Sequence, residues 1–425
     1  MLSEHKFPVD VEGTIRYRGW KVVLACFGLA IAAWSVGFYG HGLYLVELQR
    51  LHQWPTALIS SATSFYYLFS SFLMIFLDIP LKAIGPRNLA AVGVVLLALP
   101  LAALGKIVEP WQLFAAYFVM AFGWTATGLA GITSIVGPWF ERRRGLAISL
   151  ALNGASVAGI IATPLLVTST ATYGFDTAAE YMAGVILLIL LPAMLLLIRA
   201  PSPERAVSSG STAATSGADS PALTRIAVLR SWRFWSIAGP SSLALTAQVG
   251  FLYHLVAIVE ARFGRGDAAT AMAVTAICGF SGRMALGTVI DRLEPRLATA
   301  ACVGTQGLAL ILLLGSESRA AVFASSAVFG SSIGNVLMLP ILTVQRELPP
   351  AAFGKAVGLS TAIAQFAFSV GPGVLGLLRD WTGSYSVPLL FCVSLQAAAC
   401  MVALAGRRRQ TRAEARHRSG SAEIC

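Results

Sequence analysis

Twelve stretches of roughly 20 apolar residues follow one another along this 425-residue chain. Each is long enough to cross the hydrocarbon core of a bilayer as a helix. In lipid every backbone group has to be bonded within its own segment, which excludes open strands and irregular chain. The sequence therefore predicts an all-α membrane protein with twelve transmembrane helices. The predicted spans are 22–46, 56–78, 88–106, 111–136, 145–169, 178–199, 232–259, 267–290, 297–315, 320–343, 355–378 and 385–406.

The low content of charged residues agrees with this prediction. Only 12% of the residues are charged, whereas soluble globular proteins carry about 25%. A net charge of +11 would suggest nucleic acid as the partner of a soluble chain, but in a membrane protein Lys and Arg have to be counted loop by loop. We expect no nucleic-acid partner. The six cysteines show no spacing typical of a metal cluster or a disulfide framework, so we expect neither a metal nor a cofactor.

The positions of Lys and Arg predict the orientation in the membrane. The side that holds both termini carries 24 of them and the opposite side carries six. Cytoplasmic loops carry the excess of positive charge. We therefore expect both termini in the cytoplasm and the protein in the inner (plasma) membrane. The N-terminal segment lacks the short apolar region and cleavage site of a signal peptide.

A segment rich in Ser, Ala, Gly and Pro divides the chain into two halves of six spans. The expected domains are a cytoplasmic N-terminus (1–21), an N-terminal six-helix bundle (22–199), a cytoplasmic linker (200–231), a C-terminal six-helix bundle (232–406) and a basic cytoplasmic tail (407–425).

The two halves repeat one another weakly. Val36-Gly-Phe-Tyr-Gly-His41 matches Val249-Gly-Phe-Leu-Tyr-His254 at an offset of 213 residues, and Glu47 and Glu260 keep that offset. Parallel repeats of six spans with a substrate site between them are typical of one large class of secondary transporters.

Two loops then resemble the major facilitator superfamily of transporters. Gly287-Thr-Val-Ile-Asp291-Arg292-Leu-Glu-Pro-Arg296 is similar to the superfamily's loop after spans 2 and 8, and Trp139-Phe-Glu-Arg-Arg-Arg-Gly-Leu-Ala147 resembles its loop into span 5. His254-Leu-Val256, followed by Gly282-Arg283, is similar to the bacterial branch related to monocarboxylate carriers and oxalate–formate exchangers.

The resemblance implies that residues of these loops control opening on the cytoplasmic side. In the loop after span 2 this chain departs from the family pattern, because Asp78 holds the glycine position and Lys82 the aspartate position. Being four residues apart, Asp78 and Lys82 can pair on one helical face. The expected gating residues are Asp78, Lys82, Arg87, Arg142, Arg143, Arg144, Asp291, Arg292 and Arg296. The run from Arg142 to Arg144 also predicts contact with anionic lipids.

Arg283 is the one Lys or Arg that the topology leaves inside the membrane. It lies eight residues before Asp291, which is ~12 Å along a helix. An arginine at the bilayer centre costs at least ~2.5–3.5 kcal/mol, which makes a function the default hypothesis. Its planar fork suits a carboxylate, and the resemblance implies the same role. The alternative is that Arg283 bonds neighbouring helices or reaches toward the headgroups.

Two histidines occupy equivalent places in the repeat. His41 and His254 each precede a glutamate by six residues near the outer end of their spans. Because histidine changes charge near neutral pH, the pair are candidates for proton coupling or an outer gate, and His254 is also a candidate substrate residue. The alternative is that both bond water, headgroups or each other.

Further polar side chains within the spans are candidates for substrate contacts. A polar group in a span more often bonds a neighbouring helix, so each also has a structural interpretation. They are Trp124, Asn153, Gln248, Asn335 and Gln365.

Together these features predict a secondary transporter of a small organic anion, working by alternating access. A single buried positive charge favours a monoanion, which indicates a monocarboxylate. Coupling to protons would need the histidines or the substrate as carrier, because none of the 20 Asp and Glu residues lies deep within a predicted span. The alternatives are an exporter of a neutral metabolite or drug and a substrate-sensing membrane receptor. We expect a monomer, and no enzyme.

Overall fold

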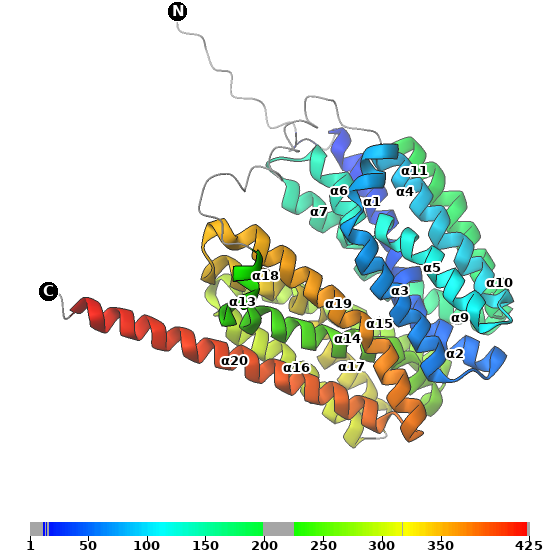
Figure 1. Ribbon diagram of the computed structural model, residues 1–425. Helices are drawn as coiled ribbons and strands as arrows, with labels where there is room; N and C mark the ends of the chain where they lie inside the picture. Colours follow the sequence, from blue (N-terminus) through cyan, green and yellow to red (C-terminus); the bar gives the residue numbers. More distant parts are fainter. Residues whose placement is uncertain (1–11, 13, 15–16, 199–224, 317, 423–425) are drawn as a thin grey trace, which may run out of the picture.

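The computed structural model describes residues 12, 14, 17–198, 225–316 and 318–422, with the side chains of 225, 291, 350, 351 and 409–422 left out. Within these residues it contains helices and no strand. Twelve helical segments are long and apolar enough to cross a membrane, as predicted. They form two bundles, the blue-to-green helices of the N-terminal half and the green-to-red helices of the C-terminal half (Figure 1).

The N-terminal half contains spans 1 to 6. Their elements, in chain order, are α1 (Arg18–Trp34), the π-helix η2 (Ser35–Tyr39), α2 (Gly40–His52), α3 (Thr56–Ile75), α4 (Asp78–Ala103), η3 (Leu104–Lys106), α5 (Pro110–Thr127), α6 (Leu129–Val136), η4 (Gly137–Trp139), α7 (Arg144–Leu152), α8 (Gly154–Val157), the π-helix η5 (Ala158–Ala162), α9 (Thr163–Tyr173), α10 (Phe175–Val185), the π-helix η6 (Ile186–Leu190) and α11 (Leu191–Leu197).

The C-terminal half contains spans 7 to 12. Its elements are α13 (Arg225–Arg230), α14 (Trp232–Phe263), α15 (Arg265–Val289), η7 (Ile290–Arg292), α16 (Pro295–Gly315), α17 (Arg319–Ile333), α18 (Asn335–Glu347), α19 (Pro350–Thr382) and α20 (Ser386–Ala422). Residue 199 and residues 200–224 of the expected linker lie outside the described residues, and residues 225–230 near the end of that linker form the short helix α13. The expected basic tail continues α20 as helix up to Ala422.

Many spans are longer than their apolar stretches. Span 1 runs from Arg18 to His52 and span 7 from Trp232 to Phe263, because a helix continues past the hydrocarbon core while hydropathy marks only the core itself. Several spans are also interrupted. Span 4 breaks at Gly128, whose extended backbone separates α5 from α6, and α4 turns at Gly85, where a φ of 78° favours glycine.

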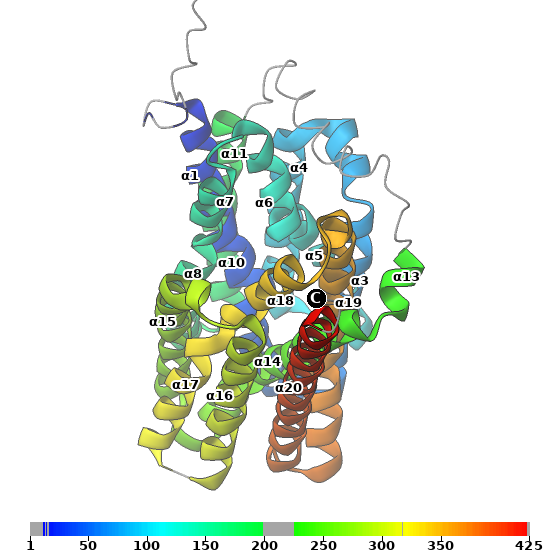
Figure 2. The same ribbon diagram turned by 90° about the vertical axis from the view of Figure 1, so that its left-hand side faces the viewer.

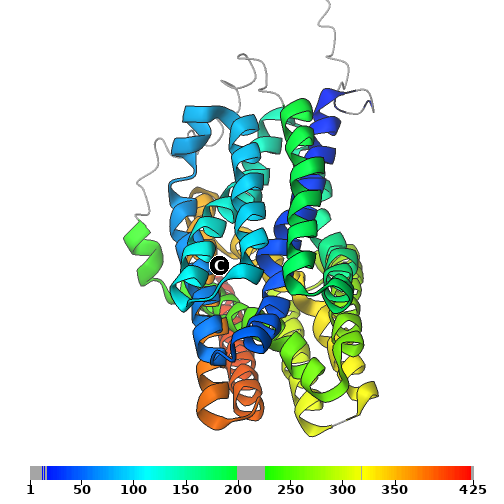
Figure 3. The same cartoon turned by 90° about the vertical axis from the view of Figure 1, so that its right-hand side faces the viewer.

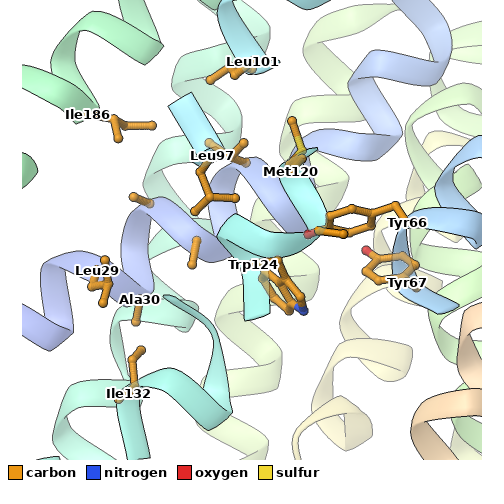
Figure 4. Packing of buried hydrophobic residues seen from close by; sticks show 14 of the residues in the cluster. Leu29, Ala30, Tyr66, Tyr67, Leu97, Leu101, Met120, Trp124, Ile132 and Ile186 are labelled. Carbon is orange, nitrogen blue, oxygen red and sulfur yellow. The ribbon is translucent and has the colours of Figure 1, made fainter. Parts of the chain in front are cut away.

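One large apolar core lies mainly in the N-terminal half and extends to residues of the C-terminal half such as Leu245 and Phe368, and a second core lies in the C-terminal half. In the N-terminal half, Trp124 of α5 lies beside Tyr66 and Tyr67 of α3 (Figure 4). The two bundles stay distinct when the molecule is turned (Figures 2 and 3). They meet through α3 with α19, α2 with α14, and α9 with α15.

These contacts gather on one side of the molecule, opposite the start of α1 and the end of α20 (Figure 1). We call the side on which α1 begins the terminal side and the opposite side the far side.

Candidate substrate site

A cavity of about 230 Å³ lies between the two halves. Val344 near the end of α18 and Val357 near the start of α19 extend it toward the terminal side. Its described lining is Trp34, Leu129, Leu152 and Ala155 from the N-terminal half and Ser241, Leu245, Arg283, Gly334, Val336, Leu337, Met338, Pro340, Ile341, Val344, Val357, Ser360, Thr361, Ala364 and Gln365 from the C-terminal half.

Arg283 is the one charged side chain in this lining. It projects from α15 onto span 10 where that span divides into α17 and α18 at Gly334. A Cβ atom built on Gly334 would lie 2.3 Å from Arg283 Nε and 2.7 Å from one terminal nitrogen. The Nε atom is buried and has no hydrogen-bond partner among the described residues. A glycine thus makes room for the guanidinium of Arg283, which lines the cavity and has a buried Nε donor without a partner among the described residues.

Gln365, from α19, is the second predicted residue that lines the cavity. The other predicted polar residues lie elsewhere. Gln248 is buried inside the C-terminal half and accepts a hydrogen bond of 2.8 Å from Gln306, which in turn accepts one of 2.7 Å from Gln396. This row of amides joins α14, α16 and α20. Gln248 thus bonds a neighbouring helix, which is the structural alternative to a substrate contact.

Asn335, Asn153 and Trp124 lie next to the cavity without appearing in its described lining. Asn335 is 5% exposed and donates to the Ser331 carbonyl at 3.3 Å, which stabilises the break in span 10. Asn153 lies between α7 and α8. Trp124 packs against Trp34, with the ring centres 5.0 Å apart, so it positions a residue that does line the cavity.

His254 is fully buried on α14 and has a partner for each ring nitrogen. Nε2 lies 3.1 Å from the Pro372 carbonyl of α19, and Nδ1 lies 3.2 Å from the Tyr385 hydroxyl. A carbonyl only accepts, so Nε2 carries the proton of the neutral ring and Nδ1 accepts from Tyr385. This histidine connects spans 7 and 11 and lies outside the cavity lining.

His41 is also fully buried, but its surroundings differ. The rings of four tyrosines surround it, with centre-to-centre distances of 4.7 to 5.7 Å: Tyr44, Tyr66, Tyr67 and Tyr117. Neither nitrogen of His41 has a hydrogen-bond partner among the described residues. The two histidines are equivalent in sequence and unlike in chemistry.

Four charged side chains close into a ring on the far side. Arg50 of α2 contacts Glu47 at 3.4 Å and Glu260 of α14 at 2.8 Å. Arg265 of α15 contacts Glu260 at 3.2 Å and donates to Glu47 as well. Two of these four contacts cross between the halves, and we call the four residues the far-side ring.

The far side is also closed by close packing of α3 on α19. Gly373 donates its backbone N–H to Ser64 Oγ at 2.8 Å, and Asp380 accepts from the backbone N–H of Ala57 at 2.6 Å. A Cβ atom on Gly376 would lie 2.6 Å from Ser60. Glycines at this seam let two helices from different halves approach closely.

The predicted gating residues of the C-terminal half differ in burial. Arg296 is 3% exposed and forms a two-pronged pair with Glu347 of α18, at 2.6 and 2.8 Å. It therefore joins spans within one half. Arg292 is exposed, and the side chain of Asp291 lies outside the described part of the chain.

The predicted gating residues of the N-terminal half are all exposed. Asp78 and Lys82 form no ion pair with each other within the described residues, although both lie in the helical segment before Gly85. Arg87 follows that turn. Glu12 accepts from the backbone N–H groups of Glu141, Arg142 and Arg143 at 2.9 to 3.1 Å, so a carboxylate covers the start of the helix that begins at Arg144.

Sequence reasoning missed the far-side ring. The sequence places Glu47 and Glu260 near the outer ends of their spans without indicating a partner, yet Glu47 is 3% exposed because Arg265 of the other half covers it. Their shared offset and the nearby arginines were the available signal. No group of three or more His, Cys, Asp or Glu suited to a metal occurs among the described residues.

The sequence of this chain matches a known protein family. The sequence profile described as Major Facilitator Superfamily matches residues 23–372. Among curated relatives, mouse (Mus musculus) monocarboxylate transporter 11 is 26% identical over 325 residues, which cover 73% of this chain and 70% of the relative. Zebrafish (Danio rerio) monocarboxylate transporter 10 is 24% identical over 416 residues, which cover 91% and 77%.

Solved structures with the same fold include the nucleoside transporter NupG, with a TM-score of 0.74 and 14% identity over 92% of this chain and 98% of that one. A bacterial homolog of the human lysosomal transporter Spinster, in an inward-facing and occupied conformation, gives a TM-score of 0.68 at 13% identity, covering 93% and 98%. At these identities the likeness shows the fold alone.

Proposed function

The chain belongs to the Major Facilitator Superfamily, and on that premise we propose that it moves a small organic monoanion, a monocarboxylate, across the membrane by alternating access. It is a multi-pass integral membrane protein and a transporter of small molecules, and not an enzyme.

The observation that supports an anionic substrate is the position of Arg283. It is the one charged group in the described lining of the cavity between the halves, with a buried Nε that has no partner there. A buried donor without an acceptor costs about 1–3 kcal/mol. A carboxylate that accepts from this fork removes that cost, which favours an anion over a neutral solute.

The charge balance of the cavity supports a single negative charge on the substrate. With Arg283 as the one cation in the described lining, a second carboxylate would have to lose its hydration without a counter-charge, which is expensive. The relatives that carry the name monocarboxylate transporter support the same class.

The asymmetry of the molecule supports alternating access. The cavity extends to the terminal side, whereas the far-side ring and the α3–α19 seam join the halves on the other side. The excess of Lys and Arg on the terminal side favours a cytoplasmic position for it. On this basis we propose that the conformation is open to the cytoplasm, that both termini lie in the cytoplasm, and that the protein resides in the inner (plasma) membrane.

We propose proton coupling as the energy source, with His254 as carrier ahead of His41. His254 bonds both to Pro372 and to Tyr385, so a change in its charge acts on the contact between spans 7 and 11. The exposed run Arg142–Arg144 suits anionic lipids, and we expect a monomer to be sufficient for transport.

The test is uptake by purified protein in liposomes. Labelled monocarboxylates, including pyruvate and lactate, are supplied with and without a pH gradient to the parent protein and to Arg283→Lys. We expect at least tenfold slower uptake by Arg283→Lys, because an ammonium lacks the two-pronged geometry. The matched control is Arg319→Lys. Arg319 is exposed and pairs with Asp267 at 3.0 Å, so that variant should transport normally.

Other outcomes decide between the alternatives. Equal uptake by Arg283→Lys and the parent would contradict the carboxylate role of Arg283. A neutral compound that is moved while all organic anions are ignored would favour the exporter. Saturable binding of a ligand without any flux would favour a substrate-sensing receptor.

A further inference from the structure

A shallow groove of about 450 Å³ lies on the outer surface of the N-terminal half, apart from the cavity between the halves. Its described lining comes from spans 3 and 4 and their connection, and it is apolar except for Lys106 and Gln112. Small side chains leave the space between Leu99 and Trp111, which are 55% and 66% exposed. The groove is therefore open to the surroundings of the helices, which in a membrane protein are lipids.

The groove begins at the level of the lipid headgroups and extends into one leaflet. Span 3 ends and span 4 begins on the far side, so Lys106 and Trp111 lie at that end of the groove. Trp and Tyr gather at the headgroup level of a membrane, and Tyr181 of α10 is also exposed near this end. Leu99 precedes Lys106 by seven residues, which is ~10 Å along a helix. That depth lies within one half of a hydrocarbon core of ~30 Å.

The headgroup end of the groove carries both signs of charge. Lys106 forms an ion pair with Glu180 of α10, in which the two side chains are 62% and 43% exposed. Asp176 lies against the neighbouring glycine, since a Cβ atom on Gly105 would lie 2.8 Å from Asp176 Oδ1. One cation thus lies beside two acids. These charges repel a headgroup that is only negative, whereas a headgroup with a phosphate and an ammonium finds a partner for each.

Gln112 adds hydrogen-bond donors whose direction is fixed. Its Oε1 accepts from the backbone N–H groups of Val108 and Glu109, at 2.8 and 3.1 Å, as in a capping box. These two bonds hold the amide in place and leave its Nε2 donors for an acceptor in the groove that Gln112 lines. The ester carbonyls of a phospholipid are such acceptors, and they lie between its headgroup and its acyl chains.

From these groups we propose that the groove binds a phospholipid with a primary ammonium headgroup, of the phosphatidylethanolamine type. Its phosphate binds Lys106, its ammonium binds Glu180, and one acyl chain lies along Leu99, Ala103 and Ala116. A primary ammonium donates up to three hydrogen bonds, whereas the trimethylammonium of phosphatidylcholine donates none. Phosphatidylglycerol has no positive charge to offer to Glu180. This site is independent of the transported substrate.

The test is lipid binding by the full-length protein in detergent, measured by native mass spectrometry. Phosphatidylethanolamine, phosphatidylcholine and phosphatidylglycerol with the same acyl chains are added in equal amounts. We expect phosphatidylethanolamine to bind about fivefold more tightly than either of the others, the effect of one favourable exposed charge pair. Equal binding of the three lipids would overturn the inference. Binding of none of them would do so too, in favour of another occupant such as a helix of a partner protein.

Glu180→Gln tests the headgroup contact. It should lower the binding of phosphatidylethanolamine to the level of phosphatidylcholine, because it removes the acid that pairs with the ammonium. The matched control is Arg319→Gln, which breaks the exposed pair of Arg319 with Asp267 at 3.0 Å in the other half and should keep the order of the lipids. The readout is a ratio between lipids in one preparation, which a loss of folded protein does not change. An unchanged order in Glu180→Gln would contradict the headgroup contact.

Ala103→Phe tests the position of the acyl chain. Ala103 is exposed and lines the groove, so the new ring should fill it and weaken the binding of phosphatidylethanolamine about fivefold by removing apolar contact area. Val92→Phe is the control, because Val92 is 45% exposed on the same helix and lies outside the described lining. Equal binding by the two variants would contradict a chain in this groove.

Discussion

Arg50 at the end of span 1 donates to Glu260 at the end of span 7 across the boundary between the halves, at 2.8 Å. The reciprocal contact, from Arg265 to Glu47, crosses the same boundary in the other direction. Glu47 and Glu260 are equivalent in the repeat, so each half presents the same acid to a base of the other. Opening the far side requires both crossing contacts to break.

The first prediction concerns this far-side ring. Arg265→Gln should favour opening on the far side, because it leaves Glu47, 3% exposed, without its partner from the other half. Losing a buried charged partner costs about 1–3 kcal/mol, which changes the ratio of two states roughly fivefold or more. The measurement is labelling of Ser60→Cys by an impermeant maleimide, in a background without the native cysteines.

Ser60 is a suitable reporter because it is buried at the seam between α3 and α19. The matched control is Arg262→Gln, an exposed arginine in the last turn of α14, which should leave the labelling rate unchanged. Equal labelling in Arg265→Gln and in the parent would show that the ring does not hold the far side closed.

The second prediction concerns the glycine seam. Gly376→Ala should prevent close contact of α19 with α3, because the new methyl would lie 2.6 Å from Ser60. We expect a cost of about 1–3 kcal/mol to the closed far side and at least tenfold slower exchange in liposomes. Gly354→Ala in the same helix, where nothing lies within 4 Å, is the control. Normal exchange by Gly376→Ala would contradict a role for close approach.

The third prediction separates folding from gating for Arg296, one of the predicted gating residues of the C-terminal half. Arg296→Ala should lower the melting temperature of the detergent-solubilised protein, because Glu347 would stay buried without its two-pronged partner at 2.6 and 2.8 Å. Breaking such a buried pair costs about 3–5 kcal/mol. Arg292 is exposed, so Arg292→Ala should have the same melting temperature as the parent protein. A gating role without a structural one would instead leave the melting temperature of Arg296→Ala unchanged and alter transport.

The scaffold could be predicted from the sequence, because hydropathy depends on each segment by itself. All twelve spans were located in this way. The sequence singles out Arg283 as a candidate for a related reason, because a charge within an apolar stretch is unusual whatever its neighbours are. Gln365 lines the cavity, whereas Gln248 bonds Gln306. The two are equally polar within their spans, and only the helix face distinguishes them.

Contacts between the halves could not be predicted in the same way. Glu47 is buried by Arg265, 218 residues away in sequence, so a reading of span 1 places it at the surface. His41 and His254 match in sequence, yet one lies among tyrosine rings and the other bonds Pro372 and Tyr385. The repeat gives the two histidines equivalent positions in their spans, while the neighbouring spans determine which groups surround each ring.

The last prediction tests proton coupling at His254. In the neutral ring Nε2–H donates to Pro372 and Nδ1 accepts from Tyr385, so an added proton goes to Nδ1 and the Tyr385 hydroxyl turns to accept it. The charged groups nearby are Arg379 and Asp380 of α19. Glutamine can donate to Pro372 and accept from Tyr385 but cannot take up a proton. His254→Gln should therefore keep exchange within about twofold of the parent and lose stimulation by a pH gradient.

Tyr385→Phe is the control for this experiment, because it removes the hydroxyl and keeps the titrating ring. It should retain stimulation by the gradient at a somewhat lower rate, since one neutral hydrogen bond contributes about 1 kcal/mol. Stimulation that persists in His254→Gln would exclude His254 as the carrier. If His41→Phe instead loses the stimulation of transport by a pH gradient, the proton carrier is His41. The two ring nitrogens of His41 have no hydrogen-bond partner in the described part of the chain.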